Sequence, residues 1–149
     1  MTTKKRILLI ESLLVLAATG AAVVGMIHLK DYVNRSEARR AMNQLGRCVL
    51  DYRKQHGSLP PQSYVDTVKG QVEGSGRIGN LRYRALWVEL DASSDTILAY
   101  SQKRHPSSLL RDGYAVLRLD GRVEWMPSAQ FQTLLTTQQS PAEVQSGKK

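Results

Sequence analysis

Residues 7–27 read ILLIESLLVLAATGAAVVGMI, an apolar run that contains one charged residue, Glu11. As an α-helix, a run of this length spans about 31 Å, which matches the hydrocarbon core of a bilayer. The three residues at 4–6 are all basic, and basic residues favour the cytoplasmic side of a membrane. The sequence therefore predicts a cytoplasmic basic leader at 1–6 and a transmembrane helix at 7–27, with the rest of the chain outside the cytoplasm.

A cleaved secretory signal is the alternative interpretation of the same run. The apolar core of such a signal has about 7–15 residues and is followed by small residues at the cleavage site. Small residues occur at 17–22, but Val23, Val24, Met26 and Ile27 continue the apolar run past them. A permanent anchor is therefore favoured, and cleavage near Val23 stays open as the alternative.

The composition of the 149-residue chain is that of a globular protein, with 42% hydrophobic and 23% charged residues. The net charge of +8 favours anionic partners such as phospholipid, nucleic acid or acidic polysaccharide, without choosing among them. Cys48 is the one cysteine, so an intramolecular disulfide is excluded, and we interpret it as a small buried residue on a helix face.

Apolar residues recur at helical spacing beyond the span, which predicts a stem helix over 28–57. The stripe consists of Leu29, Val33, Ala38, Met42, Leu45, Val49 and Tyr52. The other face of this helix is mainly basic. A solvated face is the simpler interpretation, and contact with an anionic partner is the alternative.

The helix is expected to end at Gly57, because glycine adopts the left-handed conformation of a C-cap, and Pro60 and Pro61 prevent its resumption. The head, 58–136, is too small to bury a large core alone. The stem helix would supply the missing apolar face. We therefore predict an α+β fold, in which one long N-terminal helix packs on a small antiparallel sheet.

Extended segments, turns and a short helix are expected within the head. The expected strands are Leu81–Leu90, Thr96–Gln102, Tyr114–Leu119 and Arg122–Met126, with a turn at Asp91–Asp95 and a helix from Ser128 to Leu135. Asp120-Gly121 is a strong signal for a hairpin turn. The polar tail, 137–149, is predicted to be disordered.

The stretch from Arg6 to Val15 resembles the start of type IV pilins and type II secretion pseudopilins. Glu11 matches the glutamate of that family and Ile7 its phenylalanine. The resemblance implies that a leader is removed between Arg6 and Ile7, and that Glu11 docks a subunit into a filament by pairing with a neighbour's N-terminal amine. Arg6 departs from the family, which has glycine or another small residue there, and without the cut that amine would not exist.

Two further segments resemble the same proteins. Leu50–Pro60 is similar to the end of the long pseudopilin helix, where a tyrosine is followed by a glycine and a proline, here Gly57 and Pro60. His105, followed after fourteen residues by Asp120-Gly121, resembles the His…Asp-Gly signature of bacterial pilin-like proteins, which has nine intervening residues. This signature implies a hairpin turn with its flanking strands.

Other candidate sites are weaker. Residues 74–79 match the dinucleotide-binding glycine pattern, but no strand clearly precedes them, so we interpret them as a loop. Asp91, Ser93 and Asp95 carry oxygens suited to calcium, and a plain turn is the simpler interpretation. No catalytic residue, metal or cofactor is predicted.

The resemblance implies a non-enzymatic assembly component of a type II secretion or type IV pilus-like system. Such a component is a single-pass inner-membrane protein with a periplasmic or extracellular head, and it forms homo- or hetero-oligomers with pilin-like subunits and inner-membrane assembly machinery. One alternative is a permanently anchored binding module that does not polymerise and whose basic stem and head bind an anionic partner. A small membrane-anchored enzyme is the other, and a concave pocket with clustered His105, Asp112 and Asp120 would favour it. No specific nucleic acid partner is predicted.

Overall fold

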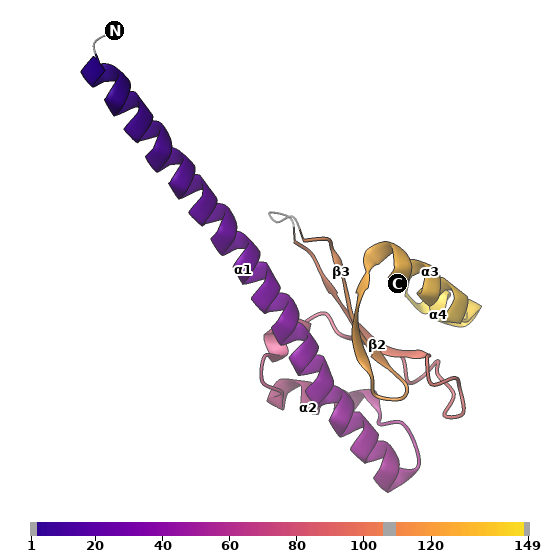
Figure 1. Cartoon of the computed structure of the whole chain (residues 1–149). Helices are drawn as coiled ribbons and strands as arrows, with labels where there is room; N and C mark the ends of the chain where they lie inside the picture. Colours follow the sequence, from indigo (N-terminus) through magenta and orange to yellow (C-terminus); the bar gives the residue numbers. More distant parts are fainter. Residues whose placement is uncertain (1–2, 106–109, 148–149) are drawn as a thin grey trace.

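The computed structural model describes residues 3–105 and 110–147, and within them one long helix packs against a four-stranded antiparallel sheet (Figure 1). The helical elements are α1 (Thr3–His56), α2 (Gln62–Gln71), the 3-10 helix η1 (Ser75–Ile78), α3 (Ser128–Gln138) and α4 (Pro141–Ser146). The strands are β1 (Arg82–Tyr83), β2 (Ile97–Lys103), β3 (Gly113–Arg118) and β4 (Val123–Pro127). This is the α+β architecture that the sequence predicts.

The stem stripe of α1 is buried where the helix crosses the head. Ala38, Met42 and Leu45 are fully buried, and Val49 nearly so. They pack with residues of α2, β2 and β3 in one continuous core. Leu29 and Val33, at the start of the stripe, remain exposed, so the head begins only beyond them.

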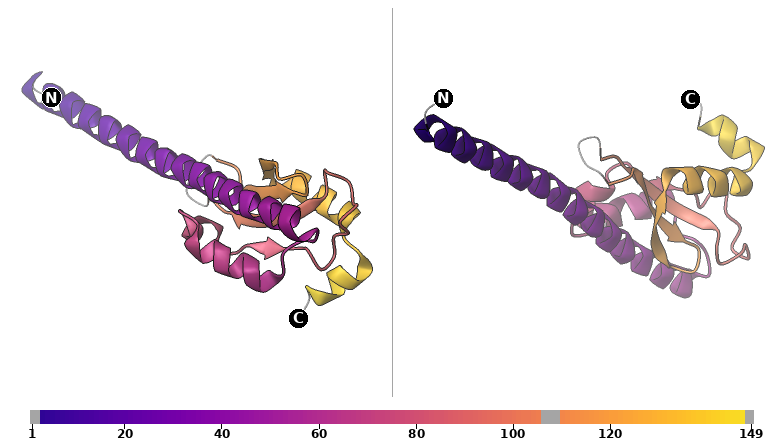
Figure 2. Two further views of the ribbon diagram at one scale, coloured as in Figure 1. Left: turned by 90° about the horizontal axis from the view of Figure 1, so that it is seen from below. Right: turned by 45° about the horizontal axis from the view of Figure 1, so that its top comes forward.

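The sheet has the strand order β1-β2-β3-β4, and each neighbouring pair is antiparallel. One face packs on α1, and α3 lies across the opposite face of β3 and β4 (Figures 1 and 2). A second core lies under α3, where Phe131 stacks on Tyr114 with ring centroids 3.8 Å apart. The helices and the sheet therefore form three layers.

The long helix ends where the sequence predicts. Gly57 follows α1 with φ +66°, and its amide donates to the carbonyl of Arg53 at 2.9 Å. Pro60 is buried, and its carbonyl accepts a hydrogen bond from the Tyr83 hydroxyl at 2.9 Å. Gly57 and Pro60 thus turn the chain back along α1.

The expected strand at Leu81–Leu90 is largely wrong. Only β1 is extended, and the Trp87 amide donates to the carbonyl of Arg84 at 2.8 Å, which closes a turn. The partial alternation does not reflect a two-sided strand, because Arg84 is buried and Leu86 is 88% exposed. The strands expected at Thr96–Gln102, Tyr114–Leu119 and Arg122–Met126 are confirmed as β2, β3 and β4 to within one or two residues.

The prediction of a disordered tail at 137–149 is wrong over residues 137–147, which form the end of α3 and all of α4. Ser140 caps α4 by accepting from the Glu143 amide. Glu143 is itself buried and forms an ion pair with Arg84. A tertiary contact therefore orders a segment whose local sequence is polar.

The β3–β4 turn depends on Gly121, which has φ +88°. A Cβ atom at this position would overlap the side chain of Leu50 on α1. Residue 121 therefore has a left-handed backbone conformation and lies in close contact with α1. Glycine alone satisfies both conditions without strain.

Gly121→Ala is expected to lower the free energy of unfolding by about 1–3 kcal/mol, because a non-glycine residue in this conformation is strained. Urea unfolding of the full chain in detergent micelles measures the change. Gly76→Ala is the matched control, since no atom lies within 4 Å of its built Cβ and its φ is not positive. Equal losses of unfolding free energy in the two variants would contradict the requirement for glycine at position 121.

Candidate functional site

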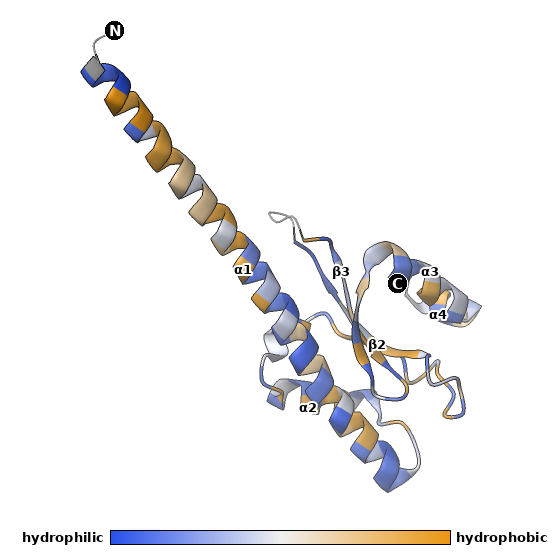
Figure 3. Cartoon of the chain, in the orientation of Figure 1, coloured by the Kyte–Doolittle hydropathy of each residue, from blue (hydrophilic) through white to orange (hydrophobic). Residues whose placement is uncertain are grey.

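The N-terminal half of α1 extends beyond the head without packing on it (Figure 1). Every residue from Lys4 to Met26 is exposed. The apolar character is concentrated in this half, whereas the half beside the head is mostly hydrophilic on its outer side (Figure 3). The core helix of a globular protein would be covered, so α1 has the length, composition and exposure of a helix that could span a membrane.

Glu11 lies within this exposed apolar half, and its carboxylate forms no ion pair or hydrogen bond with any described residue. Lys4, Lys5 and Arg6 precede it by five to seven residues, about 8–10 Å along the helix axis. An acid in hydrocarbon costs free energy and normally has a partner. No such partner lies within the described residues.

The predicted cleavage position, between Arg6 and Ile7, lies inside α1, close to its first residue. The helix continues through both residues without interruption, and both are exposed. The structure brings neither of them near the head.

His105 joins the end of the head nearest the apolar half of α1 to that helix. Its Nδ1 lies 3.7 Å from the carboxylate of Asp31, and its amide donates to the carboxylate of Asp112 at 2.6 Å. The guanidinium of Arg35 lies 4.3 Å from the ring centroid of Trp125 on β4, a cation–π contact. These contacts fix the head on α1 a few residues beyond the end of the apolar run.

Asp120 lies at the other end of β3 from His105. The β2–β3 register pairs Lys103 with Gly113 at the His105 end and Ile97 with Arg118 at the hairpin end. His105 and Asp112 therefore meet, but Asp120 is separated from them by the length of the strand. The structure therefore brings His105 and Asp112 together but not Asp120.

Asp120 instead stabilises the hairpin turn. Its two oxygens accept from the backbone amide of Arg122 at 3.0 Å and from its Nε at 2.6 Å. Burial alone would raise the pKa of the Asp120 carboxyl, but these hydrogen bonds and the positive charge outweigh it and hold the pKa below its usual value. Asp120 and Gly121 thus act within the turn, as the resemblance implies.

The two weaker motifs have local explanations. Residues 75–78 form η1, and α2, not a strand, precedes them, so a strand–loop–helix phosphate site is absent from this part of the described chain. The Asp95 carboxylate is paired with Arg122, and Ser93 Oγ accepts from the Asp95 amide. The segment therefore satisfies its own polar groups as a turn.

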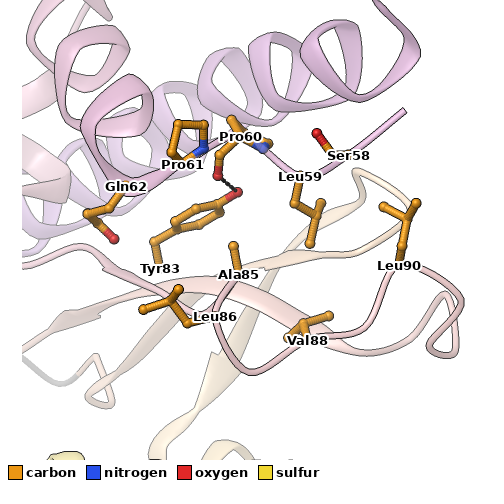
Figure 4. A pocket seen from close by; sticks show the side chains of 10 residues that line it. All are labelled: Ser58, Leu59, Pro60, Pro61, Gln62, Tyr83, Ala85, Leu86, Val88 and Leu90. Atoms are coloured by element: carbon orange, nitrogen blue, oxygen red, sulfur yellow. Dashed lines mark hydrogen bonds between the residues drawn. The ribbon is translucent and has the colours of Figure 1, made fainter. Parts of the chain in front are cut away.

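An apolar hollow of about 300 Å³ lies at the end of the head farthest from the N-terminus of α1 (Figure 4). It is lined mainly by apolar residues after α1 and after β1, including Leu59, Pro60, Val88 and Leu90. Tyr83 lies at its floor and donates to the Pro60 carbonyl (Figure 4). The sequence did not predict this hollow, because it combines two loops that are distant along the chain.

No protein-family model matches the sequence, and neither a curated protein nor a solved structure matches the chain.

Proposed function

We propose that this chain is a membrane-anchored, pilin-like structural subunit that assembles with copies of itself or with related subunits through α1. The observation that carries the proposal is the division of α1. The head covers one side of its C-terminal half, while the N-terminal half is apolar, uncovered and continuous with it. Because α1 is continuous, the packing of its N-terminal half against a neighbour would also fix the position of the head.

Glu11 supports assembly over simple anchoring. Helices in lipid gain little from apolar contact with one another, so polar pairing contributes much of the preference for a particular neighbour. The cationic partner would be the N-terminal amine of a neighbouring helix if the leader is removed, or the side chain of Lys4, Lys5 or Arg6 if it is retained. The proposed role is structural and not catalytic.

The proposed topology follows from charge. The leader, 1–6, lies in the cytoplasm, α1 crosses the inner membrane once, and the head lies in the periplasm or outside the cell. The proposed setting is a type II secretion or type IV pilus-like system with its inner-membrane assembly machinery.

A permanently anchored binding module is the second candidate, and Arg6 at the cleavage position favours it. Arg39 and Arg47 are exposed on the side of α1 that the head leaves open. That surface could hold an anionic partner without any polymerisation.

The intact mass and N-terminal residue of the protein from its native membrane distinguish these proposals. A chain that starts at Ile7 supports pilin-type processing and assembly. A chain that retains its first six residues favours the anchored module, and a start near Val23 contradicts the anchor itself.

Glu11→Ala is expected to reduce self-association in the membrane about tenfold, because it removes one charge-assisted interaction. Cross-linking of the full-length protein in its membrane, quantified over a range of expression levels, measures this change. Ser12→Ala, at the neighbouring exposed position, is expected to associate like the unmodified chain. Wild-type association by Glu11→Ala would contradict the proposed role of Glu11.

A further inference from the structure

The outer face of β1 and β2 carries two adjoining polar hollows, of about 410 and 470 Å³, on the sheet face opposite α1. Both are lined by Arg82 and Tyr100, which are directly paired across the two strands. Each volume is within the range of small-ligand sites. The two hollows are therefore treated as one surface centred on Arg82 and Tyr100, here called the Arg82 face.

Arg82 and four neutral side chains of the Arg82 face have no side-chain hydrogen bond within residues 3–105 and 110–147, whereas Tyr114 and Ser146 are hydrogen-bonded. Arg82 is exposed and forms no ion pair or side-chain hydrogen bond in this part of the chain. Four neutral side chains around it also form no hydrogen bond in this part of the chain. They are Asn80, Tyr100, Gln102 and Gln139. Burial raises the pKa of Tyr100, so its phenol stays protonated and can donate.

Aromatic rings form the other part of this surface. Trp87 is 38% exposed and lines the hollow beside α4. Tyr100 is fixed from behind by Phe131, with ring centroids 4.8 Å apart. A ligand with hydroxyl groups and an apolar ring face could therefore pack on the aromatic rings while the neutral side chains bind its hydroxyls.

The positive charge of Arg82 favours those ligands that also carry a carboxylate. Glu143 is the acid that lines it, and the buried ion pair with Arg84 neutralises that carboxylate. Arg82 is thus an unpaired cation beside neutral donors and acceptors, and a guanidinium binds a carboxylate through two parallel hydrogen bonds. Single-stranded nucleic acid would instead require several cations along its phosphates.

From these contacts we propose that the Arg82 face binds an acidic oligosaccharide, with Arg82 on a uronic-acid carboxylate and Trp87 and Tyr100 against the sugar rings. This site lies on the opposite side of the sheet from α1. It is independent of whether the chain polymerises.

Calorimetric titration of the full-length protein in detergent micelles with tetragalacturonate tests the proposal. Arg82→Gln is expected to weaken binding about tenfold or more, since it removes a charge-assisted pair. Lys30→Gln is the matched control, because it removes the same charge from an exposed position on α1, and it is expected to change the affinity less than about twofold. Maltotetraose, which has hydroxyls but no carboxylate, is expected to bind at least about tenfold more weakly.

Three results would overturn the proposal. They are the absence of tetragalacturonate binding by the unmodified chain, equal losses of affinity in Arg82→Gln and Lys30→Gln, and tighter Arg82-dependent binding of oligo-deoxythymidine than of the sugar. An unchanged thermal unfolding temperature of Arg82→Gln would exclude a folding defect in that variant. The assembly of Glu11→Ala is measured separately, so the proposed function can fail without affecting this test.

Discussion

Glu143→Ala is expected to lower the free energy of unfolding by about 3–5 kcal/mol, because it leaves the guanidinium of Arg84 buried without its counter-charge. Arg84 is 2% exposed and Glu143 is 7% exposed. The carboxylate accepts from Nε of Arg84 at 2.6 Å and from Nη2 at 2.8 Å. The remaining donors of Arg84 reach the carbonyls of Ile97 at 2.6 Å and Gln138 at 3.0 Å.

Urea unfolding of the full chain in detergent micelles, followed by near-ultraviolet circular dichroism, measures this loss. Glu89→Ala is the matched control, since Glu89 is exposed and forms no ion pair within the described residues; a change within about 0.5 kcal/mol is expected. The double variant Arg84→Met with Glu143→Leu should recover much of the stability, because apolar residues can replace a buried pair. A loss no larger than that of Glu89→Ala would show that α4 is not held by this pair.

The Arg84–Glu143 pair also marks a limit of prediction from the sequence. The two residues are 59 positions apart, and neither has a local pattern that indicates burial. Partial alternation predicted Arg84 in a strand, and polar composition predicted Glu143 in a disordered tail. Both predictions were wrong for the same reason, since a long-range contact overrides local propensity where it buries a satisfied ion pair.

Prediction succeeded where the determinants are local. The helical stripe from Ala38 to Val49 defined the packed side of α1, and Gly57 defined its end. Asp120-Gly121 located the hairpin because aspartate and glycine are favoured in tight hairpin turns. In the candidate site, Glu11 could be placed within the apolar run, whereas the hollows of the head arise only from tertiary packing.

Phe131→Ala is expected to destabilise the head by about 3–5 kcal/mol, through lost burial and the cavity that remains. Phe131 is 1% exposed and is the aromatic centre of the core under α3. Its ring stacks on Tyr114 with centroids 3.8 Å apart and lies beside the Tyr100 ring with centroids 4.8 Å apart. The same ring therefore closes the outer core and supports the Tyr100 ring of the Arg82 face.

The same unfolding measurement separates this packing role from a general effect of truncating α3. Gln130→Ala, at the preceding exposed position, is expected to stay within about 0.5 kcal/mol of the unmodified chain. Phe131→Leu keeps most of the apolar volume but loses the aromatic stack, so an intermediate loss of about 1–2 kcal/mol is expected. If Phe131→Ala cost no more than Phe131→Leu, the site would collapse around the smaller side chain, and α3 would not depend on this ring for its position on the sheet.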